Sequence, residues 1–180
     1  MVLNLYKIII NYALIYLFHC RGLAYLHDND VVHGDVKPQN VLFDKEGTRL
    51  SEVRLCDFGI SRIKKSITCT MTKSFVDGTT GYMAPETLLE RLKSKPNKKT
   101  DIWSFGATAL EILIGEDAWA VGEEDLEVVL AREMTAKNPP HGLILLEQMD
   151  EGLHEKLSKV LVYNPDSRPT AQELVTMFAL

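Results

Sequence analysis

The chain has 180 residues, 46% of them hydrophobic and 25% charged, with a formal net charge of −5. These values suit one globular domain with a sizeable core, and the acidic balance argues against a nucleic-acid partner or an anionic membrane. Three cysteines, Cys20, Cys56 and Cys69, are too few and too irregularly spaced for a disulfide framework or a cysteine-based metal knuckle. A reducing, cytoplasmic location is the simpler interpretation.

An apolar segment opens the chain, and Lys7 is its single charged residue before Arg21. It could be a targeting or anchoring segment, or the buried part of a helix. The apolar stretch 8–18 is shorter than the about 20 residues that a membrane helix needs, and no small-residue cleavage site follows it. We therefore favour a core helix over residues 8–28, ended by the turn-forming residues 28–30, and expect no membrane partner.

Two short extended runs follow, residues 40–43 and 52–56, on either side of the turn-forming residues 44–47. This arrangement predicts a β-hairpin. Residues 57–86 then lack a sustained periodicity and are rich in Ser, Thr and Gly. They are expected to form a long loop, and loops of such length in a compact domain are usually functional.

Helices are predicted for most of the second half. Thr100 or Asp101 is the expected N-cap of an apolar helix over residues 102–114, which Gly115 ends. The small residues of this helix and its apolar surface on most sides place it at the centre of the domain. One further helix is expected over residues 123–132 in an acidic region.

The chain closes with two predicted helices, about 142–162 with a break near residues 151–152, and 170–178. Thr170, followed three residues later by Glu173, predicts a capping box at the start of the last helix. The predicted fold class is therefore α+β, predominantly α-helical, with one small β-hairpin.

The residues that can carry chemistry lie in His33-Gly34-Asp35-Val36-Lys37-Pro38-Gln39-Asn40 and in Asp57-Phe58-Gly59. They supply two carboxylates, an amide oxygen and a lysine at loop ends beside the hairpin. Hard oxygen ligands of this kind suit Mg²⁺, and a lysine near a carboxylate could neutralise the charge that develops on a transferred phosphate. Taken singly, each residue would be an ordinary turn or surface residue, so the inference depends on their combination.

In order and spacing, these motifs resemble the signature set of the protein kinase family. Ala84-Pro85-Glu86, the segment Asp101–Gly106 and Arg168 extend the resemblance over nearly the whole chain. It implies a protein kinase domain over residues 1–180 that corresponds to the large C-lobe. Within it, the catalytic loop would be 33–40, the activation segment 57–86, the central helix about 101–114 and the C-terminal helices about 142–178.

The resemblance also implies roles for individual residues. Asp35 matches the catalytic aspartate that accepts or orients the proton of the substrate hydroxyl, and Lys37 matches the lysine that contacts the γ-phosphate of ATP. Asn40 and Asp57 match the ligands of Mg²⁺, and with Lys37 they form the expected cofactor site for ATP and Mg²⁺. Thr79 matches a substrate-loop threonine that contacts the catalytic aspartate and lysine. Proteins with Ser or Thr acceptors are the expected substrates.

The other motif residues have structural roles in the family: His33, Phe58, Gly59, Glu86, Asp101 and Arg168. His33 and Phe58 are expected to stack and link the two loops, and Asp101 is expected to hold the backbone of the catalytic loop. Glu86 and Arg168 are expected to form a buried ion pair between the long loop and the last helices. Loss of one partner of such a pair costs about 3–5 kcal/mol.

Gly34 departs from the family pattern, because many kinases carry arginine in this His-Arg-Asp position. That arginine pairs with a phosphorylated activation-loop residue, so loop phosphorylation is not expected to switch this protein in the usual way. The eight Ser and Thr side chains of residues 57–86 fit either phosphorylation sites or a polar mobile loop. His-Gly-Asp also resembles small-molecule phosphotransferases of the aminoglycoside and choline kinase type, but these lack the Ala-Pro-Glu segment and the helix that follows it.

No G-x-G-x-x-G occurs in the chain, and Lys7 in the first helix is no substitute for the V-A-I-K lysine. We therefore expect the small N-lobe to be absent and the isolated chain to bind ATP weakly. Two hypotheses follow. The chain is a serine/threonine protein kinase in truncated form, or it is a non-catalytic interaction module that docks a partner. A C-lobe on its own would expose the apolar face that normally meets the N-lobe. We therefore expect a missing N-lobe or a docking partner to cover this face.

Overall fold

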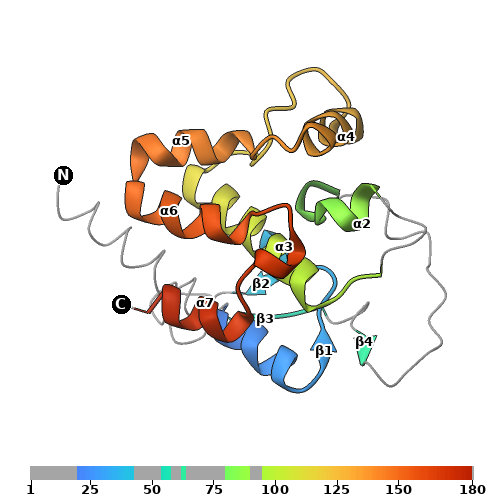
Figure 1. Ribbon diagram of the computed structural model, residues 1–180, viewed down its shortest axis with the longest axis vertical. Helices are drawn as coiled ribbons and strands as arrows, with labels where there is room; N and C mark the ends of the chain where they lie inside the picture. Colours follow the sequence, from blue (N-terminus) through green and yellow to red (C-terminus); the bar gives the residue numbers. More distant parts are fainter. Residues whose placement is uncertain (1–19, 43–53, 58–61, 64–79, 90–94, 180) are drawn as a thin grey trace.

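The computed structural model describes residues 20–42, 54–57, 62–63, 80–89 and 95–179 (Figure 1). Residues 20–28 are helical. The elements that follow in chain order are β1 (Val31–Val32), η1 (Pro38–Asn40), β2 (Val41–Leu42), β3 (Arg54–Leu55), β4 (Arg62–Ile63), η4 (Thr80–Tyr82), α2 (Pro85–Leu89), α3 (Lys98–Ile114), α4 (Leu126–Ala136), α5 (His141–Met149), α6 (Glu151–Val160), η5 (Pro165–Ser167) and α7 (Ala171–Met177). Residues 8–19 of the first predicted helix, the hairpin turn 44–47 and most of the predicted loop 57–86 lie outside the described residues.

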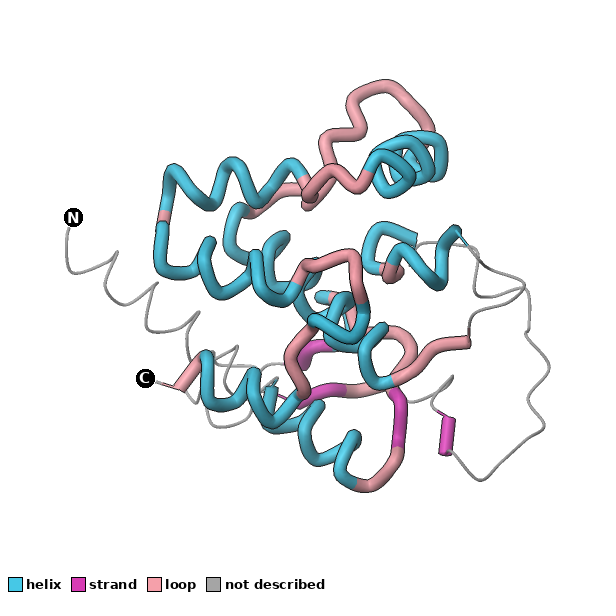
Figure 2. Tube along the Cα trace, in the orientation of Figure 1, coloured by secondary structure: helices cyan, strands magenta, loops and turns pink. Residues whose placement is uncertain are grey.

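Helix α3 runs through the middle of the described structure and packs against α5 and α6 (Figures 1 and 2). It begins earlier than predicted, because Asn97 and not Thr100 or Asp101 is its N-cap. The Asn97 side chain accepts hydrogen bonds from the backbone N–H groups of Lys99 and Thr100, and Thr100 Oγ1 accepts one from the Asn97 N–H. Thr100 is thus the reciprocal partner in a capping box. Gly115 ends the helix with φ +76°, as predicted.

The central position predicted for this helix is confirmed. The side chains of Trp103, Phe105 and Leu110 are fully buried in one core that also includes residues of the first helix, α6 and α7. Burial of such a side chain contributes roughly 1.5–3 kcal/mol. A Cβ atom at Gly106 would lie only 2.8 Å from Val160 Cγ1, so the glycine allows α3 and the end of α6 to approach closely.

Helices α4 to α7 agree with the predictions in type, with different boundaries, whereas α2 was not predicted. Helix α4 begins after the Asp125 N-cap and extends to Ala136, later than the predicted 123–132. The expected break falls at Asp150, which ends α5 and caps α6 by accepting from the Leu153 N–H. The capping box of Thr170 and Glu173 at α7 is present as predicted. The starts of α3, α4, α6 and α7 are thus set by a short polar side chain that satisfies free N–H groups, whereas Pro140 at the start of α5 makes no such bond.

Two antiparallel strand pairs accompany the helices. Strands β2 and β3 form the predicted hairpin, with Val41 opposite Leu55 and Leu42 opposite Arg54. The pairing of β1 with β4 was not predicted, since the two strands are short and far apart in sequence. The fold class is mostly helical with small β-structure, as expected. Within the described part of the chain, no helix combines the length and apolar character needed to cross a membrane.

Candidate active site

The segment between β1 and β2 brings together three of the residues predicted to act in the site. Asn40 Nδ2 donates to the Asp35 carbonyl oxygen at 2.8 Å and to Asp35 Oδ2 at 3.1 Å. Lys37 Nζ lies 2.7 Å from the same Oδ2. The turn η1 makes this possible, because Pro38 at its start folds the chain so that Asn40 returns to Asp35. One carboxylate oxygen therefore accepts both an amide and an ammonium donor.

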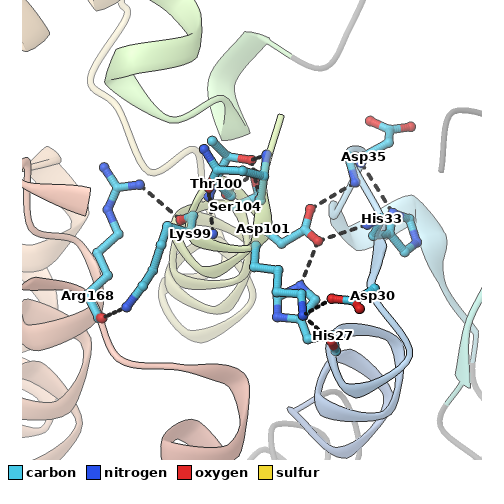
Figure 3. Close-up of polar contacts among 12 residues, drawn as sticks. His27, Asp30, His33, Asp35, Lys99, Thr100, Asp101, Ser104 and Arg168 are labelled. Carbon is cyan, nitrogen blue, oxygen red and sulfur yellow. Dashed lines mark hydrogen bonds and ion pairs between the residues drawn. The ribbon is translucent and has the colours of Figure 1, made fainter. Parts of the chain in front are cut away.

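The other carboxylate oxygen, Asp35 Oδ1, is buried and has no hydrogen-bond partner among the described residues. The Asp35 carboxylate points away from Asp101 and from α3 (Figure 3). Leaving such an acceptor unsatisfied costs about 1–3 kcal/mol, and more for a charged group. An atom of this kind is the natural acceptor for a donor supplied by a ligand, such as a hydroxyl group.

Asp57 follows the end of β3 by two residues, directly after Cys56. The Cys56 N–H donates to the Asn40 carbonyl oxygen at 2.9 Å, which continues the hairpin pairing up to Asp57. Asp57 is exposed and has φ +61°, so its backbone leaves the strand abruptly at this point. Asn40 is 5% exposed and uses its amide nitrogen on Asp35, so its oxygen remains for another donor or a cation.

A metal ion at this place would have few protein ligands. No group of three or more His, Cys, Asp or Glu side chains suited to a metal occurs in the part of the chain that the structure describes. Asn40 and Asp57 nevertheless fit Mg²⁺, which is commonly held by one or two protein oxygens together with water and phosphate oxygens. The donor set thus suits Mg²⁺ with a phosphate ligand, and it does not suit zinc.

His33 connects the catalytic loop to β3. Its Nδ1 accepts from the Asp35 N–H at 3.2 Å, and its Nε2 lies 3.1 Å from the Cys56 carbonyl oxygen. With these partners the ring carries its proton on Nε2, and both nitrogens are engaged in backbone contacts. Three further predicted residues, Phe58, Gly59 and Thr79, lie outside the described residues.

Asp101 fixes the start of the catalytic loop from α3 (Figure 3). Its Oδ2 accepts from the His33 N–H at 2.8 Å, and its Oδ1 accepts from the Gly34 N–H at 2.8 Å. The sequence analysis missed His27, whose Nε2 contacts Asp101 Oδ2 at 2.8 Å. No motif marks a histidine at the end of an apolar helix as a partner of a residue so distant in sequence. Lys98 adds to this junction by donating to the His27 carbonyl oxygen.

Gly34 adopts φ +80° while its N–H is held by Asp101. A residue with a Cβ pays about 1–2 kcal/mol in this left-handed region. We therefore expect Gly34→Ala to lower the free energy of unfolding by about 1–2 kcal/mol in urea denaturation. The matched control is Gly152→Ala in α6. There the added Cβ would lie 3.4 Å from Asp150 Oδ1, an ordinary contact distance, and alanine favours the helix. Equal effects of the two substitutions would contradict the interpretation.

A second loop, around η4, is held beside the catalytic loop. Tyr82 Oη donates to Glu111 Oε2 at 2.7 Å, and Trp119 Nε1 donates to the Gly81 carbonyl oxygen at 3.3 Å. Burial raises the pKa of Glu111, and the charge of Asp117 adds to this rise, while the bond from Tyr82 opposes it. The pKa of Tyr82 is raised above its ordinary value, mainly by burial and also by the hydrogen bond to Glu111, so the phenol remains a donor. None of these contacts was predicted from the sequence.

The expected ion pair between Glu86 and Arg168 is present and bidentate. Arg168 Nη1 and Nη2 donate to the two Glu86 carboxylate oxygens at 2.7 and 2.8 Å. The Arg168 side chain is fully buried and lies 5.0 Å from the Trp103 ring centroid. Its remaining donors contact backbone carbonyl oxygens of Val162, Lys99 and Tyr163. The pair thus joins the start of α2 to α3 and to the turn before α7.

Comparison with known proteins gives a consistent picture. The family described as "Protein kinase domain" matches residues 12–178. Similar proteins include the serine/threonine-protein kinase BCK1/SLK1/SSP31 of Saccharomyces cerevisiae, 35% identical over 87% of this chain and 10% of the relative. Mitogen-activated protein kinase kinase kinase 2 of Arabidopsis thaliana is 30% identical, over 86% of this chain and 22% of the relative. MAP kinase kinase kinase mkh1 of Schizosaccharomyces pombe is 30% identical, over 86% of this chain and 13% of the relative.

The chain spans less than a quarter of the length of these three relatives. The family match, by contrast, covers nearly all of its residues, including Asp35, Lys37 and Asn40 of the predicted catalytic loop and the Glu86–Arg168 pair. The predicted family is confirmed: the chain belongs to the protein kinase family.

Proposed function

We propose that this chain carries the phosphoryl-transfer site of a serine/threonine protein kinase. The observation that supports this most directly is the buried, unpartnered Oδ1 of Asp35, next to an Oδ2 that Lys37 and Asn40 already engage. A serine or threonine hydroxyl that donates to Oδ1 would be oriented for attack, and Asp35 would accept its proton. Lys37 would meet the phosphate oxygens on the same side.

ATP and Mg²⁺ are the proposed cofactors. Asn40 Oδ1 and the Asp57 carboxylate are the oxygens of this chain that would hold the cation, which when bound neutralises charge on the phosphates. Asn40 is positioned for this by its two bonds to Asp35, and Asp57 by the ladder contact of Cys56 with Asn40. The proposed substrates are proteins with accessible Ser or Thr side chains, and the lysine two residues after Asp35 is the feature that favours them over tyrosine.

The proposal is tested by Asp57→Asn in the natural polypeptide that contains these residues. We expect phosphate transfer to a generic serine/threonine peptide to fall by roughly a hundredfold or more, since the loss of several kcal/mol of metal binding converts to a factor of this size. Mg²⁺-dependent binding of a fluorescent ATP analogue should weaken in parallel. Glu147→Gln, the same carboxyl-to-amide change at an exposed position of α5, serves as the control.

Unchanged transfer in Asp57→Asn would contradict the proposed metal role. If the wild-type polypeptide bound a partner protein but transferred no phosphate to any Ser/Thr peptide, the interaction-module hypothesis would replace the enzymatic one. In that case Asp35→Asn and Asp57→Asn together should leave partner recovery unchanged, because neither residue would then take part in the function.

A further inference from the structure

Helix α3 is buried and mostly apolar, yet four polar side chains lie along one of its faces. Asp101, Ser104, Thr108 and Glu111 are spaced by three, four and three residues, which places them within an arc of about 80° on an α-helix. We call these four residues the polar stripe of α3. Polar groups in an apolar interior are costly unless each has a partner, so the contacts of the stripe are informative.

The partners of the polar stripe alternate between two loops. Asp101 accepts from the backbone of His33 and Gly34 in the catalytic loop, and Thr108 Oγ1 donates to the Val36 carbonyl oxygen of the same loop at 3.4 Å. Ser104 Oγ instead donates to the Tyr82 carbonyl oxygen in the η4 loop at 2.7 Å, its contact to the Thr100 carbonyl oxygen being longer at 3.1 Å. Glu111 accepts from the Tyr82 hydroxyl group.

Thr108 is placed to act directly on the reacting part of the catalytic loop. Val36, whose carbonyl oxygen it binds, lies between Asp35 and Lys37 in the chain. Both Thr108 and Val36 are fully buried. A valine would fill nearly the same volume as Thr108, so packing alone does not account for a hydroxyl group at this position.

Ser104 has the equivalent relation to the η4 loop. Its bond to the Tyr82 carbonyl oxygen supplements that of Trp119 to the Gly81 carbonyl oxygen, so consecutive peptide groups of this loop are held from outside it. Ser104 and Thr108 are one helical turn apart, which corresponds to about 6 Å along the axis. A single rigid helix therefore sets the distance between the two loops.

We propose that Thr108 and Ser104 are positioning residues with separate effects. Thr108 holds the Asp35–Lys37 part of the catalytic loop in its reactive geometry. Ser104 holds the η4 loop, which directly follows in sequence the predicted substrate-loop residue Thr79, and so acts on the peptide substrate. The proposal rests on the proposed kinase function for its kinetic consequences. Its structural basis, the attachment of the two loops to α3, can be measured without any enzymatic activity.

The test compares two near-isosteric substitutions in the natural polypeptide. Thr108→Val is expected to lower kcat about tenfold with little change in the KM for peptide, the effect of roughly 1.4 kcal/mol at the transition state. Ser104→Ala is expected to raise the KM for peptide about fivefold with little change in kcat, which corresponds to roughly 1 kcal/mol for one hydrogen bond. Each variant is the control for the other, because both remove one hydroxyl group from the same helix face.

Rescue and hydrogen exchange complete the test. Thr108→Ser keeps the hydroxyl group and should restore kcat, although it removes a buried methyl group and lowers stability. By mass spectrometry, Thr108→Val should accelerate amide hydrogen exchange in peptides that cover residues 33–40, and Ser104→Ala should do so in peptides that cover residues 80–84.

The outcomes separate the two proposals. Unchanged exchange in both segments would overturn the positioning role, whatever the activity. The positioning role would also be overturned if the two variants changed kcat and the KM for peptide by the same factors, or if Thr108→Ser failed to restore kcat. A wild-type polypeptide that transfers no phosphate would overturn the proposed function, and hydrogen exchange would then decide the positioning role alone.

Discussion

Asp35→Asn is expected to lower kcat for a serine/threonine peptide by about three orders of magnitude, within the range that loss of a general base gives. Asparagine has nearly the same shape, and its side-chain oxygen can still accept from Asn40 Nδ2, which now bonds Asp35 Oδ2 at 3.1 Å. The substitution therefore keeps the loop geometry while it removes the negative charge and the proton acceptor. The measurement is steady-state kinetics with saturating ATP and Mg²⁺.

Two features make the result specific to the site. Asp28→Asn, the same change at the exposed last residue of the first helix, should leave kcat unaffected. The variant Asp35→Asn should also retain wild-type stability within about 1 kcal/mol, because the asparagine oxygen can still accept from both Lys37 Nζ and Asn40 Nδ2. A kcat above one tenth of the wild-type value would show that Asp35 is not the group that accepts the substrate proton.

Sequence patterns identified the elements that depend on local chemistry. The capping box of Thr170 and Glu173 and the αL glycine Gly115 each follow from short-range rules, and the structure contains both. The start of α3 was predicted wrongly for a related reason. Thr100 does take part in the cap, but Asn97 three residues earlier is the N-cap, and the two roles look alike in sequence.

Contacts between distant residues were predicted only where a family motif marked both members. Glu86 and Arg168 could be paired in advance because each belongs to such a motif. His27, by contrast, reaches Asp101 across 74 positions of sequence, and Thr108 reaches Val36 across 72. Periodicity assigns His27 to the end of an apolar helix and Thr108 to a buried helix face, but it does not indicate a partner for either residue. Packing of the helices decides these contacts, and no local pattern encodes it.

The same contrast applies within the candidate site. The proximity of Asp35, Lys37 and Asn40 follows from their closeness in sequence and from the turn η1 at Pro38. The unpartnered Oδ1 of Asp35 could not be predicted, since it depends on the side-chain positions of all its neighbours. That atom adds to the motif a buried acceptor that a donor from a ligand would satisfy.

Arg168→Ala is expected to lower the free energy of unfolding by about 3–5 kcal/mol, a large part of the 5–15 kcal/mol typical of a domain. The substitution leaves the Glu86 carboxylate, which is 19% exposed, without its bidentate partner. It also removes the donors for three backbone carbonyl oxygens and the cation that lies against the Trp103 ring. Urea denaturation with an unchanged m-value would measure the loss.

A double-mutant cycle separates the ion pair from these other losses. Glu86→Ala alone leaves a fully buried guanidinium group unpaired, so it should be costly as well, whereas the double variant leaves no unpaired charge. The double variant should therefore lose about 1–3 kcal/mol less than the sum of the single variants. Arg132→Ala, which breaks an exposed pair with Glu124, should change stability little. Additive single effects would mean that Glu86 and Arg168 stabilise the fold independently, and that the junction of α2 with α3 depends on apolar packing instead.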